Sequence, residues 1–284
     1  MKLVVLADIH QRDFKWSKLA SAIKKEMPDA VCIAGDLVAN AFMLKHEEFV
    51  EKTIRKYAED IKKSCPFMFV IPGNDDNAEL STHLSSSKDS DVLWYNVHNS
   101  VYVVNDFSFG GIPYVIDHPF GYKYWSVRET NENLKINPVQ ICKKPLTMVS
   151  NKLVEIEDYA QFLMDKPSLE TYLNDLAAKV KDIKKSIFLI HCPPIGCGLD
   201  IIGSGESCGS DIVTKFIIDK QPLLTIHGHI HESPHYTGRW CCQLGNTWAI
   251  NAGQIENDLY YAVVDIQDDK VVGLRHSIYG EYKI

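Results

Sequence analysis

The chain has 284 residues, of which 45% are hydrophobic and 24% are charged, a balance typical of a globular enzyme with a full core. The formal net charge of −7 argues against broad, charge-driven binding to nucleic acid or to an anionic membrane. No apolar stretch approaches the roughly 18 residues of a transmembrane helix. The apolar start at residues 3–7 is ended by Asp8, so we expect no signal peptide and a cytoplasmic protein.

The first 76 residues repeat one pattern three times. Apolar runs at 3–7, 30–34 and 67–71 predict buried strands, and helical spacing predicts helices over 15–26 and 46–63. The three runs end in the segments Asp8-Ile9-His10, Gly35-Asp36 and Pro72-Gly73-Asn74-Asp75-Asp76. Alternating strands and helices indicate a parallel sheet, which binds ligands at the carboxyl ends of its strands. One such ending is a common turn, but three in series indicate a site.

The middle of the chain is less regular. Short strands are expected at 92–95, 101–104 and 107–109, and helices at 152–164 and 168–182, the latter with Ser168 as its N-cap. Residues 112–150 are rich in aromatic and turn-forming side chains, and a connection this long is more often functional than structural. We interpret 112–182 as an irregular and helical insertion that forms a lid or substrate wall. The alternative is that its aromatic residues simply pack against the second half.

Histidines follow two further predicted strands. His191 comes directly after the apolar run 186–190, and the run 223–226 leads into His227, His229 and His231. Side chains at spacing two on an extended chain point to the same side, so His229 and His231 can reach one small volume.

A glycine-rich segment lies between these two strands. Gly209 and Ser210 precede a predicted helix over 211–219, where backbone N–H groups could bind an anionic part of a substrate. Ser210 could equally be a simple N-cap. Strands at 247–250, 260–264 and 270–274 follow in chain order. No linker divides the chain, so we expect one domain over 1–284.

Eight cysteines are spread along the chain without a C-x-x-C pair. In a chain of this length without a secretion signal, reduced thiols are expected rather than disulfides. Cys192 and Cys197 flank a Pro-Pro turn next to His191, so a metal-binding role for them stays open.

Residues with oxygen or nitrogen ligand atoms collect at the predicted strand ends. They are Asp8, His10, Asp36, Asn74, His191, His229 and His231. The set is too large for one catalytic zinc, which takes about three protein ligands, and it suits two cations about 4 Å apart that share a carboxylate. Without thiolates among them, these ligands favour Mn, Fe or Zn, with Ni or Mg as further candidates.

In order and spacing, these motifs resemble the calcineurin-like metallophosphoesterase superfamily. The motifs are Asp8-x-His10, Gly35-Asp36, Gly73-Asn74-x-Asp76, His191 and Gly228-His229-x-His231, and the segment His229–Ser233 with Gly245–Thr247 and Asn251–Gly253 is similar to small prokaryotic members. The resemblance implies an α/β fold, a four-layer αββα sandwich of two mixed β-sheets flanked by helices. It also implies a pair of divalent metal ions and a metal-bridging hydroxide as nucleophile.

By the same resemblance, one metal would be held by Asp8, His10, Asp36 and His231. The other would be held by Asp36, Asn74, His191 and His229. Asp36, as the bridging ligand, and Asn74 would also take part in catalysis, and Asn74 would contact the substrate.

One position departs from the family pattern. Many members carry a histidine after the motif asparagine, proposed to protonate the leaving alkoxide, where this chain has Asp75. Asp75 could act as an acid only with a raised pKa, and nearby cations would lower it. His118, His227 and His235 are other candidate proton donors, and His118 is also a candidate substrate contact. Alternatively, His227 orients a ligand through a hydrogen bond; Asp76 is expected to support the site or its turn.

These features predict a dinuclear-metal-dependent phosphodiesterase acting on a small phosphate ester or nucleotide. A nucleotide pyrophosphatase, a phosphomonoesterase and a non-catalytic scaffold of the same fold remain alternatives. The negative charge and the lack of an added domain argue against a DNA nuclease. The sequence leaves open whether the chain forms a homo-oligomer.

Overall fold

The computed structural model describes residues 1–10, 12–38, 46–78, 80, 92–141, 144–150, 152–255 and 257–284. Within these ranges, no helix combines the length and apolar character needed to cross a membrane.

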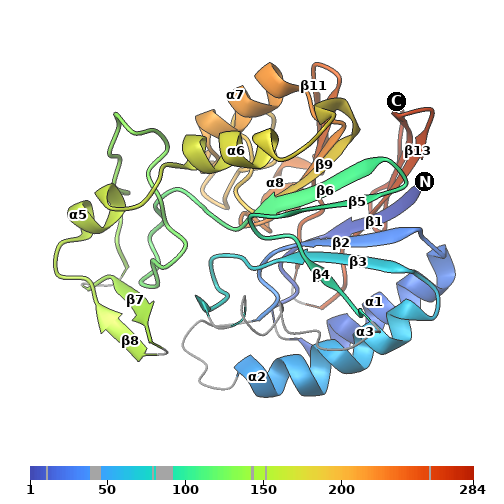
Figure 1. Ribbon diagram of the computed structural model, residues 1–284, viewed down its shortest axis with the longest axis horizontal. Helices are drawn as coiled ribbons and strands as arrows, with labels where there is room; N and C mark the ends of the chain where they lie inside the picture. The colour runs from blue at the N-terminus through green and yellow to red at the C-terminus, as the bar shows by residue number, and fades with distance from the viewer. Residues whose placement is uncertain are drawn as a thin grey trace.

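The first sheet has seven strands in the order β15-β14-β13-β1-β2-β3-β4 (Figure 1). Their bounds are β1 Lys2–Leu6, β2 Ala30–Ala34, β3 Phe67–Ile71, β4 Tyr95–Asn96, β13 Ala262–Gln267, β14 Lys270–His276 and β15 Gly280–Tyr282. Strands β1 to β4 run parallel, as expected from the alternation with helices. The C-terminal strands add antiparallel to β1, so the sheet is mixed.

The second sheet has six strands in the order β11-β12-β10-β9-β6-β5. Their bounds are β5 Val101–Val104, β6 Phe107–Ile112, β9 Ser186–Ile190, β10 Leu224–His227, β11 Cys241–Leu244 and β12 Thr247–Asn251. The central strands β6, β9, β10 and β12 are parallel, and β5 and β11 are antiparallel edges. This sheet is therefore mixed as well.

Four layers result, because both faces of each sheet are apolar. In β1, Leu3 and Val5 pack between the two sheets, whereas Val4 and Leu6 pack against the helices on the outer face. Helices α1 (Asp13–Glu26) and α3 (Arg55–Lys62) cover the first sheet, and α6 (Leu169–Ala178) and α7 (Asp211–Lys220) cover the second (Figure 1). The αββα sandwich expected from the sequence is confirmed.

The helix expected over 46–63 is not uniform. It consists of α2 (His46–Phe49), a π-helical stretch (Val50–Ile54) and α3. Short segments that the sequence did not indicate are α8 (Ser233–Thr237), the 3₁₀ turn Ile183–Lys185 and the strands β11 and β15.

The insertion differs from its prediction, since a β-hairpin forms within residues 146–155 and the helix expected over 168–182 ends at Ala178. Residues 152–164 were expected to be helical, but Lys152–Glu155 form β8, which pairs with β7 (Leu146–Val149) in a hairpin, and only Tyr159–Met164 form a helix, α5. Lys152–Glu155 have no strict alternation of polar and apolar residues, and the strand forms by antiparallel pairing with Leu146–Val149. Ser168 does cap α6, since its side chain accepts a hydrogen bond from the Thr171 N–H. Figure 1 shows β7, β8 and α5 projecting from the sandwich.

Candidate metal centre

Strand ends from both sheets meet at one edge of the sandwich. Asp8 and His10 follow β1, Asp36 follows β2 and Asn74 follows β3 in the first sheet. In the second sheet, His191 follows β9, and His229 and His231 follow β10. Because the strands that carry these residues are parallel within each sheet, all of these side chains start from carboxyl ends.

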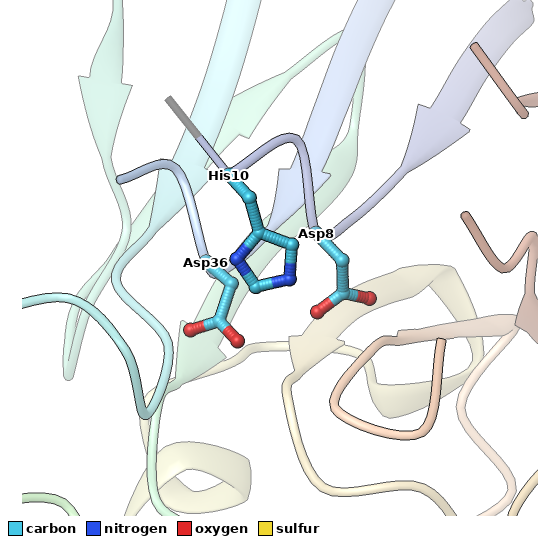
Figure 2. A group of neighbouring side chains, drawn as sticks. All are labelled: Asp8, His10 and Asp36. Carbon is cyan, nitrogen blue, oxygen red and sulfur yellow. The ribbon is translucent and has the colours of Figure 1, made fainter. Parts of the chain in front are cut away.

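Three residues from the first sheet form one group of ligand atoms. A carboxylate oxygen from each of Asp8 and Asp36 and a ring nitrogen of His10 all lie within 4.8 Å of one another. Figure 2 shows the three side chains converging from the loops after β1 and β2. Asp8 and Asp36 are buried, and Oδ2 of Asp8 has no hydrogen-bond partner among the described residues. A buried carboxylate oxygen without a partner fits a position that faces a cation.

A second group joins the two sheets. Oδ1 of Asn74 lies 2.9 Å from Nε2 of His191 and 2.5 Å from Nδ1 of His229. His191 in turn lies 3.4 Å from Oδ2 of Asp36, so this group is continuous with the first. Nδ1 of His191 is 2.7 Å from the carbonyl oxygen of Ala34, a contact that leaves Nε2 to face the group.

His231 completes the set on the side of His10. The two rings lie 5.5 Å apart between centroids at an angle of 82°. Nδ1 of His231 is 3.6 Å from a carboxylate oxygen of Glu232. The structure thus brings all seven predicted ligands to one edge of the fold, with Asp36 between the two groups.

Four of these residues have a backbone conformation that L-amino acids rarely adopt. Asp8, His10, Asp36 and His229 have φ values of 57°, 48°, 50° and 66°. Each costs of order 1 kcal/mol or more, and such strain collects at functional sites. The positive φ values therefore support a functional site independently of side-chain chemistry. No sequence pattern predicted them.

Two glycines allow the loops to approach closely. A Cβ atom on Gly73 would lie 2.3 Å from Oδ1 of Asp36, and one on Gly228 would lie 2.7 Å from Oδ2 of Asp8. Both distances are far below van der Waals contact. The glycines of the Gly-Asn and Gly-His motifs are therefore required by packing around the carboxylates.

Asp76 holds the Asp36 loop and the Asn74 loop together. Its buried carboxylate accepts hydrogen bonds from the backbone N–H groups of Leu37, Val38 and Gly73 at 3.0, 2.7 and 2.8 Å. Its carbonyl oxygen accepts a hydrogen bond from Nε1 of Trp125. Asp76 is thus a support of the two loops.

Burial changes the protonation of the site. It raises the pKa of the Asp8 carboxyl to about 8 and lowers the pKa of His10 to about 3. Burial also raises the pKa of Asp36 and lowers that of His229. Burial alone thus favours neutral imidazoles and protonated carboxyl groups, whereas divalent cations bound there would stabilise the anionic carboxylates. Oxygen and imidazole donors suit Mn, Fe or Zn.

Two further predicted site residues, Asp75 and His118, lie beside the candidate ligands. Asp75 has a side chain 38% exposed; Oδ1 accepts a hydrogen bond from the Asn74 amide, and Oδ2 lies 3.7 Å from Nδ1 of His10. His118, from the insertion, is buried, and its ring lies 5.8 Å from that of His229. Nε2 of His118 contacts Oγ of Ser126 at 3.2 Å, whereas Nδ1 is buried without a hydrogen-bond partner among the described residues.

His227 and His235 are placed differently from His118. Nδ1 of His227 is 2.9 Å from the carbonyl oxygens of both Ile190 and Cys192, and Nε2 is 2.8 Å from Oγ1 of Thr225. Its ring thus holds the backbone on either side of His191. His235 is exposed on α8, with its ring near that of Tyr236.

At the predicted anion-binding turn before α7, the hydrogen-bond donors already bind carboxylates of the protein itself. The N–H of Gly209 donates to Asp200 at 3.0 Å, and Oγ of Ser210 donates to Glu129 at 2.7 Å. Ser210 also caps α7 through the N–H groups of its first turn. This arrangement favours the N-cap interpretation over an anion site.

The cysteines near the site are buried and free. Cys192 and Cys197 pack with the outer core of the second sheet, and burial raises the pKa of the Cys192 thiol to about 12. A protonated thiol is a poor metal ligand, which argues against a metal-binding role for Cys192.

A cavity of about 530 Å³ opens beside the histidines. Its walls come from the insertion, including His118 and Phe120, and from the glycine-rich segment after β9, including Glu206. Its floor includes His229 and His231. Of these, Phe120 and Glu206 were not predicted as site residues, because their positions depend on how two distant loops face each other.

Two stacked mixed sheets of the α/β class thus bring carboxylates and imidazoles together at one edge, an arrangement that suits metal binding. The family model of the calcineurin-like phosphoesterases matches residues 1–233, and the chain belongs to this family. The resemblance inferred from the motifs is therefore confirmed. No curated protein matches the chain by sequence.

Solved structures share the fold at low sequence identity. The protein TT1561 of Thermus thermophilus is 16% identical with a TM-score of 0.58, and the match covers 98% of each chain. A dimetal phosphatase from Danio rerio is 11% identical with a TM-score of 0.55, covering 99% of this chain and 96% of that one. GAP50, the anchor in the inner membrane complex of Plasmodium, is 14% identical with a TM-score of 0.55, covering 97% and 84%. These likenesses show the fold alone.

Proposed function

We propose that the chain is a dinuclear-metal-dependent hydrolase of phosphodiesters. The observation that carries this proposal is the double contact of Asn74, whose Oδ1 lies within 2.9 Å of ring nitrogens of both His191 and His229. Next to it stands the separate group of Asp8, His10 and Asp36. Two adjoining donor groups with Asp36 between them support two cations that share one carboxylate.

In this proposal one cation is held by Asp8, His10, Asp36 and His231. The other is held by Asp36, Asn74, His191 and His229. Two divalent cations bound there would neutralise charge on a phosphate ester and lower the pKa of water towards neutrality. Mn, Fe and Zn are the metals that this donor set favours.

Residues around the ligands would keep them in place. His227 holds the backbone beside His191, and Asp76 holds the loops of Asp36 and Asn74. Asp75, close to His10, would orient that ring instead of acting as an acid. Such contacts around metal ligands fix their orientation and tune their basicity.

His118 is the proposed contact to the substrate. Burial lowers its pKa to about 3, so the ring is neutral at pH 7. If the Ser126 hydroxyl donates to Nε2, then Nδ1 carries the hydrogen and can donate it to an ester oxygen. The contact would be lost in His118→Ala but kept in part in His118→Asn, which retains a donor.

One observation favours diesters over monoesters as substrates, and another favours a reducing compartment for the protein. Asp75 stands where, by the family resemblance, many members carry a histidine proposed to protonate the leaving alkoxide, and branches that lack this histidine resemble phosphodiesterases. The seven cysteines that the structure describes are all free, which supports a cytoplasmic location.

The test compares bis(p-nitrophenyl) phosphate with p-nitrophenyl phosphate as substrates. The protein is stripped of metal and reloaded with Mn, Zn, Fe, Ni or Mg, and Asp36→Asn and His229→Ala serve as inactive variants. We expect metal-dependent turnover that is higher for the diester and lost in both variants. Turnover that persists in both variants, or no turnover with any metal, would reject the proposal.

A further inference from the structure

The cavity next to the candidate metal centre has an unusual charge distribution. It is formed where residues 117–120 of the insertion face residues 202–208 of the glycine-rich segment, above His229 and His231. A substrate bound at the metals would extend one of its ester groups into this space. The chemistry of the walls therefore bears on which ester groups fit.

The charge of one lining carboxylate is neutralised by its neighbours. Asp117 forms a buried ion pair with Lys123 at 2.7 Å, and Tyr159 donates a further hydrogen bond to it at 2.5 Å. Oδ2 of Asp117 also accepts hydrogen bonds from the backbone of Asn137 and from the side chain of Gln140. Lys123 is fully buried, so its ammonium group is directed to Asp117 rather than to the cavity.

Two other lining carboxylates lack a lysine or arginine partner in the described structure. Glu206 is exposed and accepts a hydrogen bond from Oγ of Ser204 at 3.1 Å. Glu232 lies 3.6 Å from His231, and its side chain is 33% exposed. No lysine or arginine is among the described residues that line the cavity. Lys15, which is close to the site, is hydrogen bonded to Gln254 instead.

The rest of the lining is apolar, apart from one polar group. Phe120 and Val139 are 53% and 63% exposed, although both belong to the cavity wall. His118 lines the same cavity; it is only 5% exposed, and its Nδ1 has no partner among the residues described. An unpaired buried donor or acceptor beside exposed apolar groups points to a bound ligand.

We propose that this cavity holds the alcohol part of the phosphodiester and selects a positively charged alcohol over a negatively charged one. The inference rests on the proposed binding of a phosphate ester at the metal centre. Glu206 and Glu232 would attract an organic ammonium group, and the exposed face of Phe120 would pack against it. The same carboxylates would repel an alcohol that carries a carboxylate or a further phosphate.

Binding of three phosphonates to the metal-loaded protein tests the proposal without turnover, because a phosphoesterase does not cleave their C–P bond. The probes are 2-aminoethylphosphonate, propylphosphonate and 3-phosphonopropionate, which differ mainly in the charge at the far end. Calorimetric titration should give the tightest binding for the first and the weakest for the last, with about a tenfold ratio of dissociation constants between these two.

A matched pair of variants locates the selection. Glu206→Gln should reduce that ratio, whereas Glu281→Gln, an exposed acidic residue on β15 outside the cavity lining, should leave it unchanged. Raising the salt concentration should also reduce the ratio, since exposed charges are screened.

Several outcomes would overturn the inference: equal or reversed affinities, no binding of any probe, or a ratio unchanged in Glu206→Gln. The proposed function fails separately. Absence of diester turnover alongside the predicted binding order would reject the hydrolase and keep the selective cavity. Turnover with the reverse binding order would keep the hydrolase and reject the selectivity.

Discussion

Oδ1 of Asn74 lies 2.5 Å from Nδ1 of His229, although the two residues are 155 positions apart in the chain. Asn74 follows β3 of the first sheet and His229 follows β10 of the second, so the contact joins the two halves of the sandwich. The site exists only when both sheets are stacked. Metal binding and the packing of the two sheets should therefore depend on each other.

Replacing Asn74 by alanine should weaken one of the two cation positions and leave the other. The group of Asp8, His10 and Asp36 does not include Asn74. We expect metal content to fall from about two to about one ion per chain, measured by inductively coupled plasma mass spectrometry after dialysis. Asn246→Ala, an exposed position outside the site, is the control. Two tightly bound ions in Asn74→Ala would contradict the assignment.

Gly228 should not tolerate even one methyl group. A Cβ there would lie 2.6 Å from Cβ of Ala7 and 2.7 Å from Oδ2 of Asp8, so the Asp8 loop would have to move. We expect Gly228→Ala to lower kcat/KM for a diester by at least about 100-fold, because about 1 Å of misplacement at a catalytic group has that effect. In Gly273→Ala, by contrast, the nearest atom to the new Cβ would be Oδ2 of the Asp265 side chain, at 3.1 Å. Equal activities of the two variants would contradict this account.

Asp76 should be a large contributor to stability. In Asp76→Ala, the N–H groups of Leu37, Val38 and Gly73 lose their acceptor in a buried place. Each unsatisfied group costs about 1–3 kcal/mol, so the free energy of unfolding should fall by at least about 3 kcal/mol. Urea unfolding measures this loss. Asp76→Asn keeps one acceptor oxygen and should lose less; a loss below about 1 kcal/mol in the alanine variant would be inconsistent with the three bonds.

His276 should make the protein less stable as the pH falls. It is buried, and its pKa is lowered to about 4 by burial, below the ordinary value of 6.5. Nδ1 accepts hydrogen bonds from the N–H groups of Ile278 and Tyr279, and Nε2 faces the carbonyl oxygen of Ala252. Protonation of Nδ1 would break both accepted bonds. Between pH 6.5 and 4 the unfolded chain binds more protons than the folded chain, so stability is lost over this window as pH decreases.

The loss from His276 should reach about 3 kcal/mol at pH 4. Urea midpoints between pH 7 and 4 should therefore change less in His276→Gln than in the parent protein. His235→Gln, at an exposed histidine, should behave like the parent. The same pH dependence in parent and His276→Gln would refute the assignment.

The sequence predicted that the candidate ligands would gather at one edge, because each of them follows a locally encoded strand end. An apolar run followed by Asp-x-His, Gly-Asp, Gly-Asn or Gly-His indicates both the end of a strand and the type of ligand that follows it. The parallel order of β1, β2 and β3 then brings Asp8, Asp36 and Asn74 to one edge. The central strands and the Ser168 cap were predicted on the same local grounds.

Features that depend on distant contacts were not predictable in this way. The strand Lys152–Glu155 is a hairpin partner of β7, and its register depends on pairing rather than on helical or strand propensity alone. Gly209 and Ser210 have the pattern of an anion-binding turn. In the structure, however, the Gly209 N–H donates to the carboxylate of Asp200, and the Ser210 hydroxyl donates to that of Glu129. The left-handed backbone of Asp8, Asp36 and His229 likewise becomes visible only in three dimensions.

The central claim is that Asp36 is shared by two cations, and reconstitution with Mn²⁺ tests it most directly. Metal analysis and electron paramagnetic resonance are measured together on the parent chain and on Asp36→Asn. The account predicts about two manganese ions per chain with a spin-coupled spectrum, and loss of both the coupling and at least one ion in Asp36→Asn. Retention of two ions in Asp36→Asn, or uncoupled ions or no bound metal in the parent, would contradict it.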